Sequence, residues 1–152
     1  KKEVTGNQGN RNKDFKFTIK VDGAAGEQYY VTFSDGKAPT TLVSGEAKTI
    51  TLKDNETAKI FGLSETDEYT VTEASYADDG YKTTIDNVET LTTTGTITGN
   101  SDKNITVVND KTTNSPTGIF LHVAPYIALI GAAIASSLLF FRRKRAKDMD
   151  ID

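Results

Sequence analysis

Apolar and polar side chains alternate with a period of two through most of the first 110 residues. The clearest run is 15–21, in which aromatic and aliphatic residues alternate with lysine and threonine. A period of two places the two kinds of side chain on opposite faces of a β-strand. Similar runs, each predicted to form a strand, cover residues 29–33, 49–52, 58–61, 68–73, 81–85, 95–98 and 104–108.

Short turn signals separate these runs, and no long amphipathic helix interrupts them. Glycine, asparagine and aspartate favour the backbone conformations that tight turns require. Many short strands with this punctuation predict an all-β, immunoglobulin-like antiparallel sandwich, formed by residues 1–111 as one domain. The turn signals are Asp35-Gly36, Ser44-Gly45, Lys53-Asp54-Asn55, Asp78-Asp79-Gly80 and Gly99-Asn100.

A different pattern begins after a short linker, residues 112–118. The 23 residues 119–141 carry no formal charge, and four basic residues follow directly at 142–145. As a helix, this stretch would be roughly 34 Å long, enough to cross the hydrocarbon core of a membrane. Basic residues stay on the cytoplasmic side, so we expect one C-terminal transmembrane helix, a cytoplasmic tail at 142–152 and an external domain.

Composition and charge narrow the possible functions. The chain lacks cysteine, which excludes disulfides and thiolate metal sites, and we expect neither a metal nor a cofactor. Residues 1–118 hold 13 basic and 18 acidic side chains, a balance that argues against nucleic acid as a partner. The single histidine, His122, lies in the apolar span, so we expect no turnover enzyme. Because the chain opens at Lys1 without an export signal, we expect it to be the C-terminal part of a longer protein.

Three polar residues fall on the apolar phase of a predicted strand, each two positions from a valine: Lys2, Glu73 and Asn109. A low-dielectric interior lowers the pKa of an amine, and the uncharged amine is a nucleophile. A neighbouring carboxylic acid can polarise an amide carbonyl. Attack of Lys2 on the Asn109 side chain, with loss of ammonia, would form an isopeptide bond. Each of these residues, taken singly, is also typical of a solvated strand end. Because all three fall on apolar phases, we favour the isopeptide reaction.

The same residues carry a resemblance to a known family. The chain resembles the isopeptide-linkage domains of streptococcal pilins and the B-type repeats of collagen adhesins over nearly all of residues 1–111. This resemblance implies a cross-link between Lys2 in the first strand and Asn109 in the last, with Glu73 of a central strand as the catalytic residue. Lys1 is an alternative donor. The motifs are Lys2-x-Val4-x-Gly6-Asn7, Lys13-x-Phe15-x-Phe17, Gly62-Leu63, Tyr69-x-Val71-x-Glu73 and Val107-x-Asn109.

The linker carries a second resemblance. Three segments follow one another here: the pentapeptide Asn114-Ser115-Pro116-Thr117-Gly118, the apolar span and the basic tail. This order resembles the cell-wall sorting signal of Gram-positive surface proteins, although Asn114 and Ser115 replace the usual leucine and proline. In that family a sortase cleaves the Thr-Gly bond, here Thr117-Gly118. It joins the new carboxyl group to peptidoglycan or to a neighbouring pilin subunit. The resemblance implies a membrane-inserted precursor and a final location in the cell wall.

The sequence therefore predicts a sortase-anchored structural protein of the cell surface, a pilus subunit or stalk module stiffened by its own isopeptide bond. One alternative is an adhesin domain that binds a host ligand through its loops. Another is a membrane receptor that is never cleaved, for which the Pro-Thr-Gly sequence is accidental.

Overall fold

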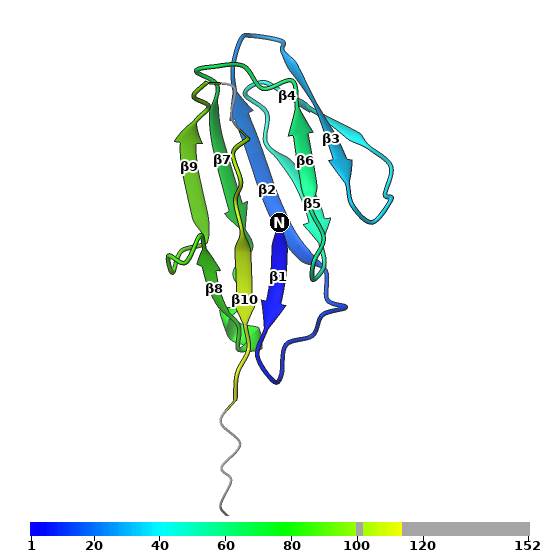
Figure 1. Ribbon diagram of the computed structural model, residues 1–152, viewed down its shortest axis with the longest axis vertical. Helices are drawn as coiled ribbons and strands as arrows, with labels where there is room; N and C mark the ends of the chain where they lie inside the picture. The colour runs from blue at the N-terminus through cyan, green and yellow to red at the C-terminus, as the bar shows by residue number, and fades with distance from the viewer. Residues whose placement is uncertain (100–101, 114–152) are drawn as a thin grey trace, which may run out of the picture. The chain divides into compact units, whose positions relative to one another are not determined.

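The structure, a computed structural model, describes residues 1–99 and 102–113, and residues 1–113 form one compact unit. Within these ranges the chain forms ten strands and one 3₁₀ turn (Figure 1). Their bounds are β1 Lys2–Thr5, β2 Phe15–Asp22, β3 Gln28–Phe33, β4 Thr40–Val43, β5 Lys48–Leu52, β6 Ala58–Phe61, β7 Glu68–Glu73, η1 Ala77–Asp79, β8 Lys82–Ile85, β9 Thr92–Thr96 and β10 Val107–Asp110.

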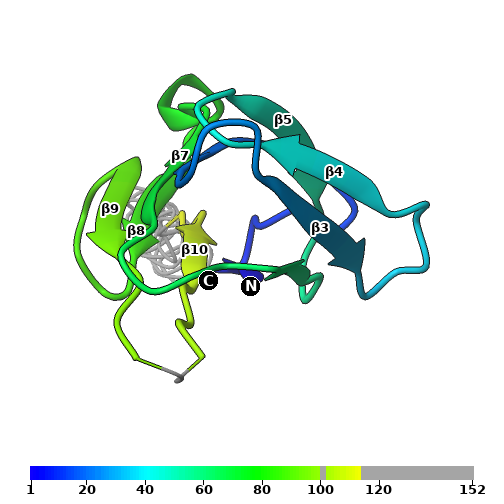
Figure 2. The ribbon, with the colours of Figure 1, turned by 90° about the horizontal axis from the view of Figure 1, so that it is seen from above.

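The described strands form three sheets, ordered β1-β10-β8, β5-β2-β7-β9 and β4-β3-β6. Seen from above, the sheets surround a common interior (Figure 2). The long strand β2 lies between β5 and β7 and faces the sheet that holds the first and last strands. The prediction of an all-β domain built largely from antiparallel strands is therefore confirmed.

One pair of described strands is parallel, which the antiparallel prediction did not include. Strand β1 runs parallel to β10, with Lys2 beside Val107 and Val4 beside Asn109. Antiparallel neighbours are often joined by a tight hairpin, whereas strands far apart in the sequence are free of that constraint. The first and last strands of the domain therefore lie side by side and point in the same direction.

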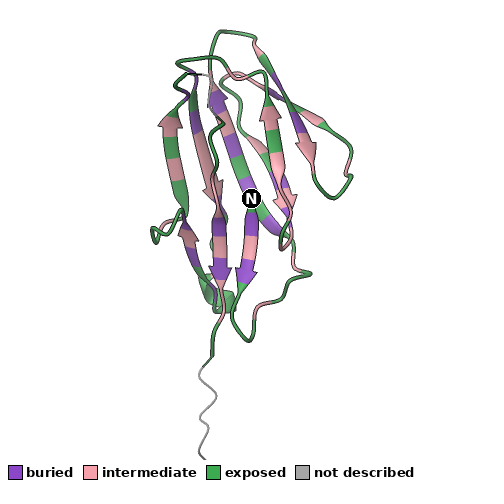
Figure 3. Ribbon diagram, in the orientation of Figure 1, coloured by how far each residue is buried: buried purple, intermediate pink, exposed green. Residues whose placement is uncertain are grey.

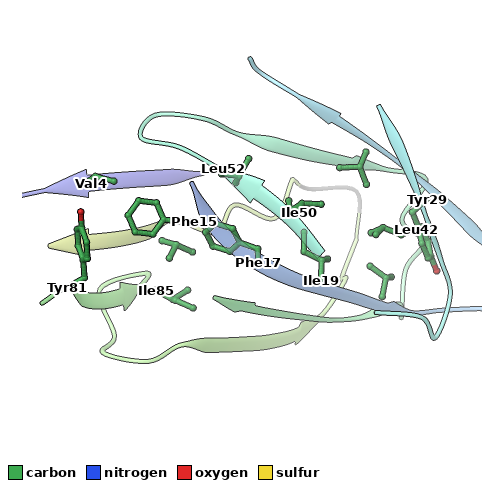
Figure 4. Close-up of a cluster of buried hydrophobic side chains, with 13 residues drawn as sticks. Val4, Phe15, Phe17, Ile19, Tyr29, Leu42, Ile50, Leu52, Tyr81 and Ile85 are labelled. Carbon is green, nitrogen blue, oxygen red and sulfur yellow. The ribbon is translucent and has the colours of Figure 1, made fainter. Parts of the chain in front are cut away.

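Burial follows the alternation that the sequence predicted. Along β2, buried residues alternate with exposed or half-buried ones (Figure 3). The core side chains gather in one cluster, in which Val4, Phe15 and Tyr81 lie at one end and Tyr29 and Leu42 at the other (Figure 4). Phe15 and Tyr81 meet edge to face, with ring centroids 5.4 Å apart. This aromatic end of the core underlies β1.

Several predicted boundaries differ from the observed ones. The run 104–108 is displaced to β10, Val107–Asp110, because its pairing with β1 sets where the strand begins. The run 95–98 is displaced to β9, Thr92–Thr96, which pairs with β7. Strand β4 was not predicted. No helix in the described ranges is long and apolar enough to cross a membrane, and the predicted span 119–141 lies outside them.

Candidate functional site

Lys2 lies at the start of β1 with its side chain fully buried. The strand is fixed on both edges: β10 pairs with one, and the backbone of the 53–56 turn holds the other. The Lys2 N–H donates to Glu56 O at 2.9 Å, and the Lys2 carbonyl accepts from Asn55 N–H at 2.8 Å. The Val4 N–H donates to a carboxylate oxygen of Asp54 at 2.7 Å. These bonds leave the Lys2 side chain only the interior face of the strand.

Glu73 ends β7 in the facing sheet and is 1% exposed. Its backbone N–H donates to Leu91 O at 2.8 Å, and its neighbour on β2 is Phe17. Its carboxylate oxygen Oε2 accepts a hydrogen bond of 3.1 Å from the Thr83 hydroxyl. The carboxylate is thus held from the side of β8.

Asn109 lies in β10, between β1 and β8, and is fully buried. Its neighbours are Val4 on β1 and Thr83 on β8. It therefore belongs to the strand next to Lys2 and is the direct neighbour of the residue that binds Glu73. We call Lys2, Glu73 and Asn109 the Lys-Glu-Asn cluster.

The polar atoms of the Lys-Glu-Asn cluster have few partners. Lys2 Nζ lies 3.2 Å from Glu73 Oε1, an ion-pair distance, and 4.3 Å from the centroid of the Phe15 ring. Four buried side-chain atoms lack a hydrogen bond: Lys2 Nζ, Glu73 Oε1, Asn109 Nδ2 and Asn109 Oδ1. Lys2 Nζ and Glu73 Oε1 have each other as ion-pair partners, whereas the two amide atoms of Asn109 have no partner among the described residues. A buried polar atom without a partner typically destabilises a protein by about 1–3 kcal/mol. A site with this arrangement needs a reason other than stability.

Burial changes the protonation of Lys2. Loss of hydration lowers the pKa of the Lys2 amine to about 8, although the neighbouring Glu73 carboxylate acts in the opposite direction. An amine with this pKa is uncharged in about a tenth of molecules at pH 7, whereas an ordinary lysine is almost entirely charged. The Lys-Glu-Asn cluster thus contains a nucleophilic amine, a carboxyl group able to exchange a proton with it, and a side-chain amide on the adjacent strand.

The other predicted site residues lie elsewhere. Lys1 is exposed, and its amine pairs with Glu3 at 2.7 Å. Residues Asn114 to Gly118, the predicted sortase motif, lie outside the described ranges. Thr83 was not singled out from the sequence. The alternation of the run 81–85 already placed it on the inward face with Tyr81 and Ile85.

A separate cleft of about 940 Å³ opens beside β6. It is lined by inward-facing residues of β2 and β5, including Ile19 and Ile50, and by Lys59 and Lys103. Among the described residues that line it, Lys1 is present but the members of the Lys-Glu-Asn cluster are not. The cleft and the cluster are therefore different candidate sites.

Known proteins share this fold and part of this sequence. A curated pilin from Streptococcus pyogenes serotype M1 is 36% identical over 169 aligned positions, which cover 96% of this chain. A solved pilus-presented adhesin, Cpa, is 31% identical with a TM-score of 0.60 over 74% of this chain and 26% of the adhesin. The major pilin of Streptococcus pyogenes is 26% identical with a TM-score of 0.58 over 74% of this chain and 46% of the pilin.

These relatives define the class: an all-β domain similar to those of streptococcal pilins and pilus adhesins, which are structural and adhesive proteins rather than enzymes. The chain belongs to the family described as a domain of unknown function, DUF7601, whose model matches residues 1–111. The chain spans about half the length of the curated pilin, 48%. The pilin has also been solved with a single glutamate or a single asparagine replaced by alanine.

Proposed function

We propose that residues 1–111 form a tension-bearing module of a cell-surface fibre, stiffened by an isopeptide bond between Lys2 and Asn109 that Glu73 promotes. One observation carries the proposal: the amine, the carboxyl group and the amide are buried in one core, and four of their polar atoms lack a hydrogen bond. The similarity to pilins and to a pilus-presented adhesin supports the same function.

The reaction balances without a cofactor. The buried pair begins as an ammonium and a carboxylate, and Lys2 passes a proton to Glu73 Oε1, 3.2 Å away. The neutral amine attacks Cγ of Asn109, and a new N–C bond forms as the bond from Cγ to Nδ2 breaks. Ammonia leaves with a second proton from the amine. Glu73 keeps one proton, so the product is an amide beside a neutral acid. The Lys-Glu-Asn cluster then holds no charge.

The choice of donor has a direct test. The burial of Lys2 and the exposure of Lys1 favour Lys2. We expect Lys2→Ala to abolish the loss of about 17 Da that accompanies release of ammonia, and Lys1→Ala, the matched control, to retain it. Intact-mass spectrometry of the two variants measures this. A variant lacking Lys2 that still loses ammonia would contradict the assignment.

Anchoring to the cell wall by a sortase at Thr117-Gly118 is part of the same proposal. It is supported by the motif and its position before an uncharged span and a basic cluster. We expect Thr117→Ala to leave the protein in the membrane fraction of a sortase-bearing Gram-positive host, whereas Thr113→Ala remains in the wall fraction. Native protein that stays in the membrane fraction, as Thr117→Ala is expected to, would favour the uncleaved-receptor alternative and an accidental motif.

The cleft beside β6 favours a second candidate function, a ligand-binding adhesin domain. Apolar clefts of this size are typical of ligand sites. If the cleft binds a host ligand, cells that display Ile60→Lys should adhere less than cells that display the native protein, at equal surface expression. Unchanged adhesion would exclude the cleft as the binding site.

A further inference from the structure

Thr83 connects strand β8, which pairs with the strand of Asn109, to the carboxylate of Glu73. It lies in β8 and is 8% exposed. Its backbone is paired with Asn109, while its hydroxyl donates to Glu73 Oε2 in the facing sheet. The hydroxyl therefore bridges two sheets within the Lys-Glu-Asn cluster.

The two oxygens of Glu73 have different surroundings. Oε2 accepts the hydrogen bond from Thr83 at 3.1 Å, whereas Oε1 faces Lys2 Nζ at 3.2 Å. Oε2 already faces the hydrogen of the Thr83 hydroxyl. A carboxyl proton on Oε2 would compete with that hydrogen bond, whereas a proton on Oε1 would not. A proton that Glu73 takes from Lys2 is therefore kept on Oε1, the oxygen that faces the amine.

We infer that Thr83 is a positioning residue for isopeptide formation, which fixes the rotation of the Glu73 carboxyl group and directs its proton to the reacting side. This inference rests on the proposed function. A β-branched side chain on a strand has few χ1 rotamers, so the Thr83 hydroxyl is held in place by its own backbone. Without it, the carboxyl group can turn and present either oxygen to Lys2, and the productive arrangement is populated less often.

Two substitutions separate the hydroxyl from the shape of the side chain. Thr83→Val keeps the shape and removes the donor, whereas Thr83→Ser keeps the donor and removes a methyl group. Thr84→Val is the matched control on the same strand, because Thr84 is half-buried on the opposite face. A purely structural role predicts that valine is tolerated at least as well as serine. A positioning role predicts instead that Thr83→Ser reacts faster than Thr83→Val.

The rate is measured by cell-free synthesis of the whole chain, with samples quenched in acid at timed intervals and analysed by intact mass. We expect Thr83→Val to lose ammonia about tenfold or more slowly than the native chain. Thr83→Ser and Thr84→Val should react at close to the native rate. Circular dichroism and protease resistance at each time point establish that the variant is folded; if Thr83→Val does not fold, Thr83→Ala replaces it.

The outcomes distinguish the inference from the proposed function. If the native chain never loses ammonia, the isopeptide proposal itself fails. If the native chain reacts and folded Thr83→Val reacts equally fast, Thr83 has no positioning role and the isopeptide proposal stands. Equal slowing by valine and serine would also overturn the inference, because the hydroxyl would then be irrelevant.

Discussion

Lys2, Glu73 and Asn109 bring a charged pair and an amide into an interior made mostly of aromatic and aliphatic groups. Buried ion pairs are rarely a net gain in stability, since desolvation of both charges opposes their attraction. The proposed reaction removes this conflict, because ammonia leaves and the acid stays neutral. The unreacted domain is thus the strained species, and the cross-linked domain is the relaxed one.

The buried amine makes the unreacted domain sensitive to pH. The pKa of Lys2 is about 8 in the folded chain and 10.5 ordinarily, so the unfolded chain binds more protons between these values. Stability therefore rises with pH across that window, by up to about 1.4 kcal/mol per pH unit. Urea unfolding of Asn109→Ala at pH 7.5 and pH 10 measures the rise.

The control is Lys2→Met/Glu73→Gln, which also cannot cross-link but lacks the buried ion pair. All other titrating groups are common to the two proteins. Parallel pH dependence in both would show that Lys2 titrates as an ordinary surface lysine, contrary to its burial.

Glu73→Gln tests the carboxyl group with little change of shape. We expect this variant to fold, to keep the mass calculated from its sequence, and to be less stable than the native domain by about 4 to 5 kcal/mol, the effect of closing a loop of about 100 residues. Mass spectrometry and chemical denaturation measure the two effects. Glu68→Gln, at the exposed start of β7, is the matched control. A fully cross-linked Glu73→Gln protein would refute the role assigned to the acid.

At the scale of strands, the parallel pair β1 and β10 determines how the domain bears load. Force applied where the chain enters β1 and where it leaves β10 pulls the two strands in opposite directions along their lengths. Under this shear, all hydrogen bonds between β1 and β10 bear the force at the same time, rather than one after another. The proposed amide bond between Lys2 and Asn109 would join these two strands, so the force would pass through covalent bonds and the rest of the sandwich would remain folded.

The turn after β1 is expected to be intolerant of side chains. Gly6 has φ +85°, and a Cβ there would lie 2.3 Å from Lys111 O, beyond the end of β10. Gly36 has φ +80° with nothing within 4 Å and is the matched control. We expect Gly36→Ala to destabilise by about 1–2 kcal/mol through backbone strain alone. Gly6→Ala should destabilise clearly more, because the β1–β10 ends must separate. Equal thermal shifts for the two variants would contradict the close approach.

Strands with a buried and an exposed face could be predicted from the sequence, as β2 and β7 show. Strand β4 could not, because its four residues hold only one fully buried side chain, Leu42, and follow Pro39. The end of β10 was missed because Asn109 and Asp110 are poor strand formers. Pairing with Val4 and Thr5 overrides that preference.

The alternation of inward and outward side chains also predicted part of the Lys-Glu-Asn cluster. Alternation is local, so it assigns Lys2, Glu73 and Asn109 to inward faces without knowledge of the fold. The 3.2 Å approach of Lys2 to Glu73 depends on how two sheets face each other, which no local pattern contains. The hydrogen bond from Thr83 to Glu73 also joins two sheets, so the sequence pattern alone does not predict it.

At the scale of the whole molecule, the proposed function is that of a stiff module in a cell-surface fibre. The family match covers residues 1–111, and the curated pilin extends beyond the matched half. In a fibre, each module would transmit force from its first strand to its last through one amide bond. The sorting motif would then couple the last module to the cell wall or to the next subunit.

The intact mass of the native chain, followed by peptide mapping, is the sharpest test of the proposed cross-link. We expect a mass about 17 Da below the value calculated from the sequence, the loss of one ammonia. Peptide mapping should recover a branched peptide that joins Lys2 to Asn109. A mass equal to the calculated value, in a folded protein, would contradict the cross-link and leave an ordinary β-sandwich with a buried ion pair.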